Sequence, residues 1–365
     1  MLFLMGGPVI GGVIVQYADW AWIFLLNLPV GLLALSATIH LGLPPQAPST
    51  RPFDLIGAGL LITGLPSFIL GLEWLGHPVK DALWLAPTLA AVGALLTFGC
   101  IWQSWRAPSP LLEIRLLAPK VMSSQALVLA LATLIMCAQT VYGAIYLQEV
   151  LAFSPMQAGL GSLPLLLPVV LVIRTAGTMY DRMGSAKLVV VGFAIAFIGL
   201  MIETAGVLLH SYVILAIGMM LVGGGSTFAS TPANTDLLSR APGDRRAEVS
   251  GIIQTMRQLG GSLGIVICVI AIGLTVRASM PSQMPNTPDG QIAERALEGD
   301  VPAIRQLEEV NPDLAKTLSQ ARTNGLAAAF GIQAIAALLA LLIAAWWLLP
   351  ATAQEKHAPS ASDHQ

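Results

Sequence analysis

The stretch 188–209, LVVVGFAIAFIGLMIETAGVLL, contains 22 residues and a single charged side chain, that of Glu203. A bilayer core about 30 Å thick is crossed by a helix of about 20 apolar residues. A helix also pairs its own backbone polar groups, which find no water partner inside lipid. The stretch therefore predicts a transmembrane helix, and the same pattern recurs along the chain.

The composition of all 365 residues agrees with this reading: 55% are hydrophobic and 10% are charged, and the mean hydropathy is +0.75. A water-soluble protein of this length needs far more polar surface. The predicted fold class is an all-α integral membrane bundle of about ten transmembrane helices. The predicted spans lie near 1–17, 21–43, 54–76, 82–105, 122–147, 157–177, 188–209, 212–236, 249–276 and 326–349.

The distribution of Lys and Arg predicts the orientation, because short cytoplasmic loops are enriched in these residues. Both termini are expected inside, and the long segment 277–325 outside, since long loops cross largely regardless of their charge. The tryptophans agree, because indoles favour the headgroup level and all eight lie near span ends. The cations that mark the cytoplasmic loops are Arg51, Arg106, Arg115, Lys120, Arg182, Lys187, Arg240, Arg245 and Arg246, with Lys356 in the tail.

Enzyme chemistry leaves no trace in the sequence. It contains no nucleotide-binding loop, no His/Cys metal spacing and no nucleophile elbow. Cys100, Cys137 and Cys268 lie far apart within spans and are expected to be small packing residues. We therefore expect no enzyme activity, no cofactor, no metal and no nucleic-acid partner; membrane lipid is the first partner.

Polar side chains recur on one face of the fifth span. Gln139, Tyr142 and Tyr146 follow one another at i, i+3 and i+7, which places them on the same side of a helix. An aromatic face with an amide suits apolar or cationic organic ligands. A packed face, whose hydroxyls bond neighbouring helices, fits the pattern equally well. Both interpretations remain open at this point.

Charged and amide groups also occur within other spans. Gln254, Arg257 and Gln258 occupy two adjacent turns, which indicates either a water-filled cavity or an arginine that extends to the inner interface. Arg174 is expected to extend to the interface or to contribute to a gate. Glu203 suits a proton site, but we favour the interpretation that it reaches the outer headgroups.

Glycine and proline are abundant, with 35 and 24 residues. The pairs Gly7/Gly11 and Gly260/Gly264 have the small-xxx-small spacing that lets helix backbones approach closely. Prolines inside spans are typical of helices that bend during transport. Together they favour a moving bundle over a static anchor. The prolines within predicted spans are Pro8, Pro66, Pro87, Pro164, Pro168 and Pro232.

Several motifs occur in one order along nearly the whole chain. Gly7-Pro8-Val-Ile-Gly11-Gly12 resembles an antiporter motif of a fifth span, and WAWIFLLNLPVG at 20–31 resembles the opening of a sixth. FDLIG at 53–57, PLLEIRL at 110–116, YLQEVLAFSPMQAGL at 146–160 and the segment 250–264 resemble later junctions. This combination is similar to the major facilitator superfamily, in its fourteen-span drug/proton antiporter branch.

The resemblance implies a register in which this chain begins at the fifth span. It implies four parts. Residues 1–43 are an incomplete N-terminal half of two spans, and 44–121 hold two linker spans and a cytoplasmic connector. Residues 122–349 are a complete six-span half with an extracytoplasmic loop at 277–325, and 350–365 are a cytoplasmic tail.

The resemblance also implies a function: proton-coupled efflux of small amphipathic or cationic organic compounds across a bacterial inner membrane, by alternating access. Protons, an organic substrate and an accessory or adaptor protein are the implied partners. A truncated, non-transporting fragment or an accessory half is the alternative. The implied cavity residues are Gln139, Tyr142, Tyr146, Gln254, Arg257 and Gln258; the packing residues near the exit are Gly7, Pro8, Gly11 and Gly12; and the gating loop contains Gly177, Asp181, Arg182 and Gly184, with Thr178, Ser185 and Ala186 where basic residues are common.

Overall fold

The computed structural model describes residues 2–19, 21–41, 54–76, 84–107, 110, 114–279, 292, 306–307 and 309–350. Within these ranges every regular element is a helix, and nine helical segments are long and apolar enough to cross a membrane. The helix α1 (Leu2–Tyr17) is a shorter apolar helix beside them. The predicted all-α membrane fold is therefore confirmed.

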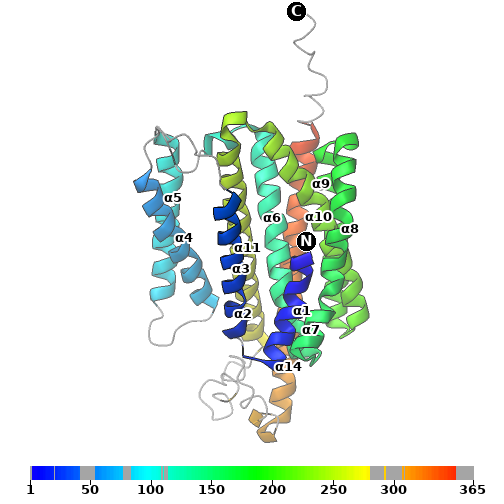
Figure 1. Cartoon of the computed structure of the whole chain (residues 1–365). Coiled ribbons are helices and arrows are strands. Elements are labelled where there is room, and N and C mark those ends of the chain that lie inside the picture. The colour runs from blue at the N-terminus through cyan, green and yellow to red at the C-terminus, as the bar shows by residue number, and fades with distance from the viewer. Residues whose placement is uncertain are drawn as a thin grey trace, which may run out of the picture.

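The helices run up and down beside one another (Figure 1). After α1, the N-terminal third of the chain contributes α2 (Ala21–Leu25), α3 (Asn27–Leu41), α4 (Leu55–Gly76), α5 (Leu85–Arg106) and the short η1 (Ile114–Leu117). The rest of the chain contributes α6 (Lys120–Ile145), the π-helical turn η2 (Tyr146–Val150), α7 (Pro155–Gly161), α8 (Leu163–Met183), α9 (Ser185–Leu208), α10 (Tyr212–Arg240), η3 (Gly243–Arg245), α11 (Arg246–Ser279), α14 (Pro312–Ile343) and the π-helical η5 (Ala344–Leu348).

The apolar core lies among α6, α9, α10 and α14, where Leu129, Phe193, Leu200 and Phe330 are fully buried. Glycines let these helices approach closely, as their lack of a side chain permits. A Cβ at Gly192 of α9 would lie 2.6 Å from the backbone nitrogen of Ala229 on α10. The helices from α6 to α14, in which α7 and α8 together make one membrane-length segment, therefore form one tightly packed unit of six spans, here called the six-helix unit.

The predicted close approach at Gly260 and Gly264 is confirmed on α11. A Cβ at Gly260 would lie 2.0 Å from the carbonyl oxygen of Ala130, and one at Gly264 would lie 2.4 Å from that of Leu134. Both oxygens belong to α6. The two glycines are thus the surface through which α11 packs against α6.

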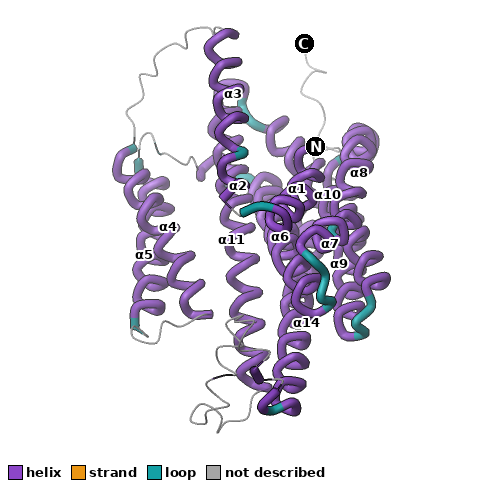
Figure 2. Tube along the Cα trace, turned by 60° about the horizontal axis from the view of Figure 1, so that its bottom comes forward, coloured by secondary structure: helices purple, strands orange, loops and turns teal. Residues whose placement is uncertain are grey.

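The helices α4 and α5 form a hairpin that contacts the six-helix unit through α11 (Figures 1 and 2). They pack through glycines, since a Cβ at Gly93 of α5 would lie 2.1 Å from the backbone nitrogen of Phe68. Their outer faces expose large apolar side chains such as Ile62 (71%) and Leu95 (70%). Such faces suit contact with lipid.

The start of the last span differs from the prediction. The predicted span begins near residue 326, but α14 begins earlier, with Pro312 in its first turn. Proline is well accommodated there, because its missing N–H would have no helical partner. Asn311 caps this end, since its side-chain oxygen accepts from the backbone N–H of Leu314 at 3.1 Å. Residues 312–325 therefore form the first turns of α14, and 280–291 and 293–305 lie outside the described residues.

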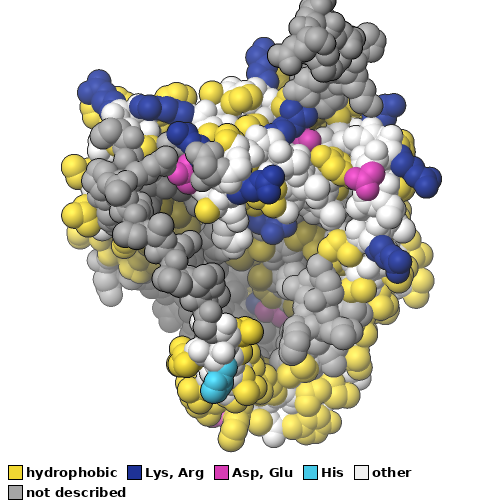
Figure 3. Space-filling model, turned by 45° about the horizontal axis from the view of Figure 1, so that its top comes forward, with side chains coloured by type: hydrophobic (Ala, Val, Ile, Leu, Met, Phe, Trp, Pro, Cys, Tyr) yellow, Lys and Arg dark blue, Asp and Glu magenta, His cyan; other side chains and the backbone are white. Residues whose placement is uncertain are grey.

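Lys and Arg side chains gather around the end of the bundle that lies at the top of Figure 1 and is brought forward in Figure 3. This end carries the α5–α6, α8–α9 and α10–α11 connections, whose cations the sequence places on the cytoplasmic side. Arg51 and Lys356 lie outside the described residues. The predicted orientation places all of these connections on one side of the membrane, and their cations do gather at one end of the bundle (Figure 3).

Candidate functional site

A cavity of about 430 Å³ lies between α1 and the six-helix unit. Its wall combines apolar side chains with two amides and two hydroxyls, and it contains no charged residue among those described. The small residues at the α1 and α7 side keep the space open. The lining residues are Gly11, Gly12, Val15, Gln139, Thr140, Ala144, Gln148, Pro155, Ala158, Gly159, Ser162, Leu165, Leu166 and Met219.

Two of the predicted motif glycines lie at the α1 side of this cavity. A Cβ at Gly12 would lie 2.5 Å from the carbonyl oxygen of Pro155, so only glycine lets α1 approach α7 this closely. The backbone N–H of Met156 donates to Oε1 of Gln16 at 3.2 Å and fixes the same contact. Gly11 lines the cavity, whereas Gly7 has open space around it. The side chain of Pro8 lies outside the described residues.

Another part of the cavity wall is built by η2, which leads from α6 to α7. The π-helical turn η2 continues α6 and brings Gln148 to the wall. Single π-helical turns inside α-helices are frequent at functional sites. The following helix α7 begins with a capping box between Ser154 and Gln157, which fixes where it starts.

The two predicted tyrosines of α6 and η2 are packed between helices. The hydroxyl of Tyr142 donates to the carbonyl oxygen of Ile265 on α11 at 2.8 Å, and that of Tyr146 donates to Val207 on α9 at 3.3 Å. Their exposed fractions are 3% and 0%. This is the arrangement of the packed-face interpretation, and of the three residues on that face only Gln139 borders the cavity.

Gln139 joins the cavity wall to Glu203 on α9. The amide Nε2 donates to Oε1 of Glu203 at 2.6 Å, and both side chains are fully buried. The expectation that Glu203 reaches the outer headgroups is therefore wrong. Its helix turns it toward α6, and Gly218 of α10 provides the room, since a Cβ there would lie 2.4 Å from Cγ of Glu203.

The predicted polar group on α11 lies elsewhere. Gln254 and Gln258 are exposed and Arg257 is half-buried. Gly260, one turn beyond Arg257, packs against α6. These three residues do not line the cavity formed by the described residues, and their contact with substrate stays a prediction.

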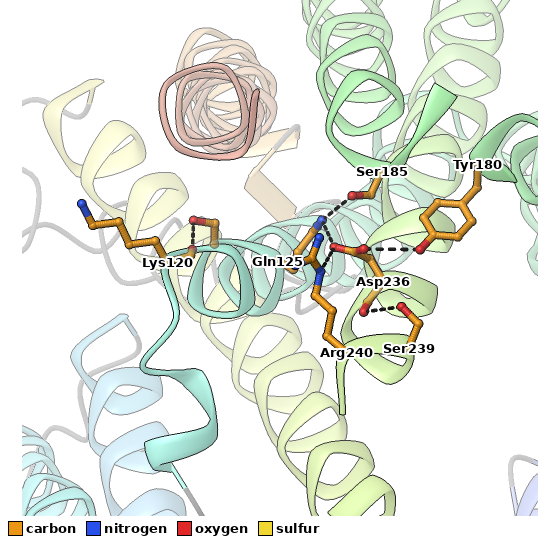
Figure 4. A network of polar contacts seen from close by, with 8 residues as sticks. Lys120, Gln125, Tyr180, Ser185, Asp236, Ser239 and Arg240 are labelled. Atoms are coloured by element: carbon orange, nitrogen blue, oxygen red, sulfur yellow. Dashed lines mark hydrogen bonds and ion pairs between the residues drawn. The ribbon is translucent and has the colours of Figure 1, made fainter. Parts of the chain in front are cut away.

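A buried polar network connects four helices at the cationic end of the bundle (Figure 4). Oδ2 of Asp236 on α10 accepts from Nε2 of Gln125 and from Nε of Arg240, each at 3.0 Å. Oδ1 accepts from the Tyr180 hydroxyl of α8 at 3.3 Å. Gln125 also donates to Oγ of Ser185 on α9 at 2.9 Å.

The predicted gating loop lies directly beside this network. Gly184 has a φ of +79°, a conformation that glycine adopts at little cost, and it joins α8 to α9. Asp181 and Arg182 are exposed at the end of α8, and Gly177 has open space around it. Sequence reasoning missed Asp236, although an acid four residues before Arg240 at the end of a span was a usable signal.

These features define a multi-pass α-helical membrane protein with a mixed polar and apolar cavity between its helices. Residues 1–265 match the family model of the Major Facilitator Superfamily, which is more than half of the chain. The chain belongs to this superfamily, a family of transporters and not of enzymes.

The curated relatives share about 30% sequence identity with this chain over the aligned residues. A multidrug resistance protein B homolog of Mycobacterium tuberculosis is 30% identical over 275 residues, which are 73% of this chain and 50% of the relative. A Salmonella paratyphi A protein named for multidrug resistance, MdtD, is 29% identical over 269 residues, which are 73% of this chain and 57% of the relative. The chain thus spans about half the length of the curated relatives that it matches.

A solved structure shows a weaker similarity. It is that of a bacterial homologue of the human lysosomal transporter Spinster, in an inward-facing and occupied conformation. The sequence identity is 16%, the TM-score is 0.48, and the match covers 80% of this chain and 67% of that one.

Proposed function

We propose that this chain serves proton-coupled export of small amphipathic or cationic organic compounds by alternating access. The observation that carries the proposal is the cavity between α1 and the six-helix unit. The names of the relatives from Mycobacterium and Salmonella, which refer to multidrug resistance, support the same substrate class.

The cavity wall has the chemistry that such compounds need. Its volume of about 430 Å³ falls within the usual range for small-molecule sites. Leu165, Leu166 and Met219 offer apolar surface, and the flexible methionine adapts to ligands of different shape. Gln148 offers an amide that can donate and accept, and Gln139 borders the cavity with its Nε2 already bonded to Glu203. A wall of this kind accepts many ligands because it fixes few of their atoms.

The buried network around Asp236 supports movement of the six-helix unit as one body. It links α6, α8, α9 and α10 at one end through side-chain bonds. The contact between α1 and α7 is instead narrow and rests on Gly12 and Gln16. Rocking of the six-helix unit against α1 would open or close the cavity with few bonds broken.

The test is efflux of ethidium from vesicles that contain the purified chain, driven by an imposed proton gradient. Gln148→Leu removes one cavity amide, whose hydrogen bond is worth about 1 kcal/mol, so we expect transport to fall by roughly three- to tenfold. Gln103→Leu makes the same exchange on α5, away from the cavity, and should leave transport unchanged. Equal transport by both variants would refute the role of the cavity.

A second candidate is an accessory half that other helices complete. The exposed Gln254 and Gln258 of α11 favour it, because amides in the middle of a span are costly against lipid. The helix α3 also has no buried residue in the described structure. Under this alternative, the efflux assay gives no transport with the chain alone and transport when those helices are supplied.

A further inference from the structure

Glu203 is a carboxyl group enclosed by three helices. It has no exposed surface, it contacts Gln139 of α6, and Gly218 of α10 lies against its side chain. The cavity described above ends at Gln139, whose own side chain is unreached by solvent. The Gln139 amide group therefore lies between the Glu203 carboxyl group and the cavity.

The surroundings of Glu203 favour its neutral form. A buried ionised carboxylate requires a paired charge, and Glu203 accepts a hydrogen bond from a neutral amide. On α10, Asp236 lies 18 residues beyond Gly218, roughly 27 Å along a helix, and it bonds Arg240. On α14, Arg322 pairs with Glu149 at 3.3 Å.

Other ionisable groups lie on α9 itself and on the elements that pack around it. One of them, Tyr146, donates its hydroxyl to the backbone of Val207. Gln139 is thus the polar neighbour that decides how Glu203 is satisfied. The remaining ionisable residues are Lys120, Cys137 and Tyr142 on α6, Arg174, Tyr180, Asp181 and Arg182 on α8, Lys187 on α9 itself, Tyr212 on α10, and Asp313 and Lys316 on α14.

The hydrogen bonding of the pair is half complete. Nε2 of Gln139 donates to Oε1 of Glu203, while Oε2 of Glu203 and Oε1 of Gln139 are both buried without a partner. Two buried acceptors cannot bond each other. A carboxylic acid and an amide, however, form a two-bond pair in which N–H meets one oxygen and O–H donates to the amide oxygen. One proton on Oε2 supplies the second bond.

We propose that Glu203 is a proton-binding site that is coupled to the cavity through its hydrogen bond with Gln139. The proposal deepens the proposed function, since it assigns a proton site to the six-helix unit. A ligand donor that bonds Oε1 of Gln139 competes with the Glu203 O–H for that oxygen and weakens the hydrogen bond that holds the proton. Ligand binding therefore lowers the affinity of Glu203 for its proton. Proton binding lowers the affinity for ligand by the same factor, as exchange of one for the other requires.

The experiment is infrared difference spectroscopy of the purified chain in lipid vesicles, which records the C=O stretch of protonated carboxyl groups. We expect such a band in the wild type, its loss in Glu203→Gln, and its decrease when ethidium is added. In Gln139→Leu the band should remain but no longer respond to ethidium. Glu149→Gln is the matched control, because Glu149 is exposed and paired with Arg322, and it should keep the band.

Two outcomes would overturn the proposal: a wild type without the band, or a band that is unchanged in Glu203→Gln. Glu203→Asp keeps the carboxyl group on a shorter side chain and should shift the band, so the assignment does not depend on one variant being inserted correctly. The result is also separable from transport. A Glu203-dependent band in a chain that moves no ethidium would refute the proposed function and support the site. Proton-driven transport without the band would refute the site alone.

Discussion

Gly260→Ala tests whether the packing of α11 against α6 depends on glycine. The added Cβ would lie 2.0 Å from the carbonyl oxygen of Ala130, whereas ordinary contact begins at 3.4 Å. The helices must therefore separate locally by about 1.4 Å (3.4 − 2.0). The atom that is hit belongs to a helix backbone, so no flexible side chain can move aside.

The expected cost follows from three contributions. Overpacking of this kind costs about 1–3 kcal/mol. The hydrogen bond from Tyr142 to Ile265, one turn beyond Gly260, is stretched by the same separation and contributes about 0.6 kcal/mol in a membrane helix pair. Alanine returns about 1 kcal/mol through its better helix propensity. The net loss of stability is about 0.6–2.6 kcal/mol.

The assay is reversible unfolding in mixed detergent micelles, followed by tryptophan fluorescence. Gly251→Ala is the control, because it makes the same exchange in the same helix with nothing within 4 Å of the added Cβ. It should leave stability unchanged or raise it by up to about 1 kcal/mol. If Gly260→Ala unfolds at the same detergent fraction as Gly251→Ala, the inferred tight packing is incorrect.

Two further predictions concern the ends of the bundle. Asp236→Asn removes the charge that bonds Arg240 and should lower unfolding stability by about 1–3 kcal/mol, measured in the same assay; an unchanged midpoint would exclude a structural role for the network. Gly12→Val places a side chain against the Pro155 carbonyl oxygen and should reduce ethidium efflux at least tenfold, whereas Gly31→Ala, with nothing within 4 Å, should not. Efflux that survives Gly12→Val would show that the α1–α7 contact is dispensable.

Composition and run length were sufficient to predict the helices, because lipid imposes one requirement on every span: an apolar surface and internally paired backbone groups. The contact of Gly260 and Gly264 with α6 was also predictable, since small-xxx-small spacing has a direct meaning between helices. The first turns of α14 were not. Their polar residues resemble a loop, and Pro312 is compatible with either a break or a helix start.

The site was harder to predict, because helical spacing gives the face of a residue but not its neighbour. Gln139 and Tyr142 share one face of α6, yet the amide borders the cavity and the hydroxyl bonds α11. Glu203 was interpreted as interfacial from its place near the end of a span. Its orientation depends on Gly218, which belongs to another helix, and one sequence does not reveal such a pairing.

The length of the last helix has a consequence of its own. From Pro312 to Leu348 it spans 37 residues, roughly 56 Å, against a hydrocarbon layer of about 30 Å. Its first turns, with Lys316 and the exposed Ser319, must then project beyond the hydrocarbon layer. A small tilt of the six-helix unit would carry this tip farther than any residue near the membrane centre, so a dye attached there would magnify the motion into a readable signal.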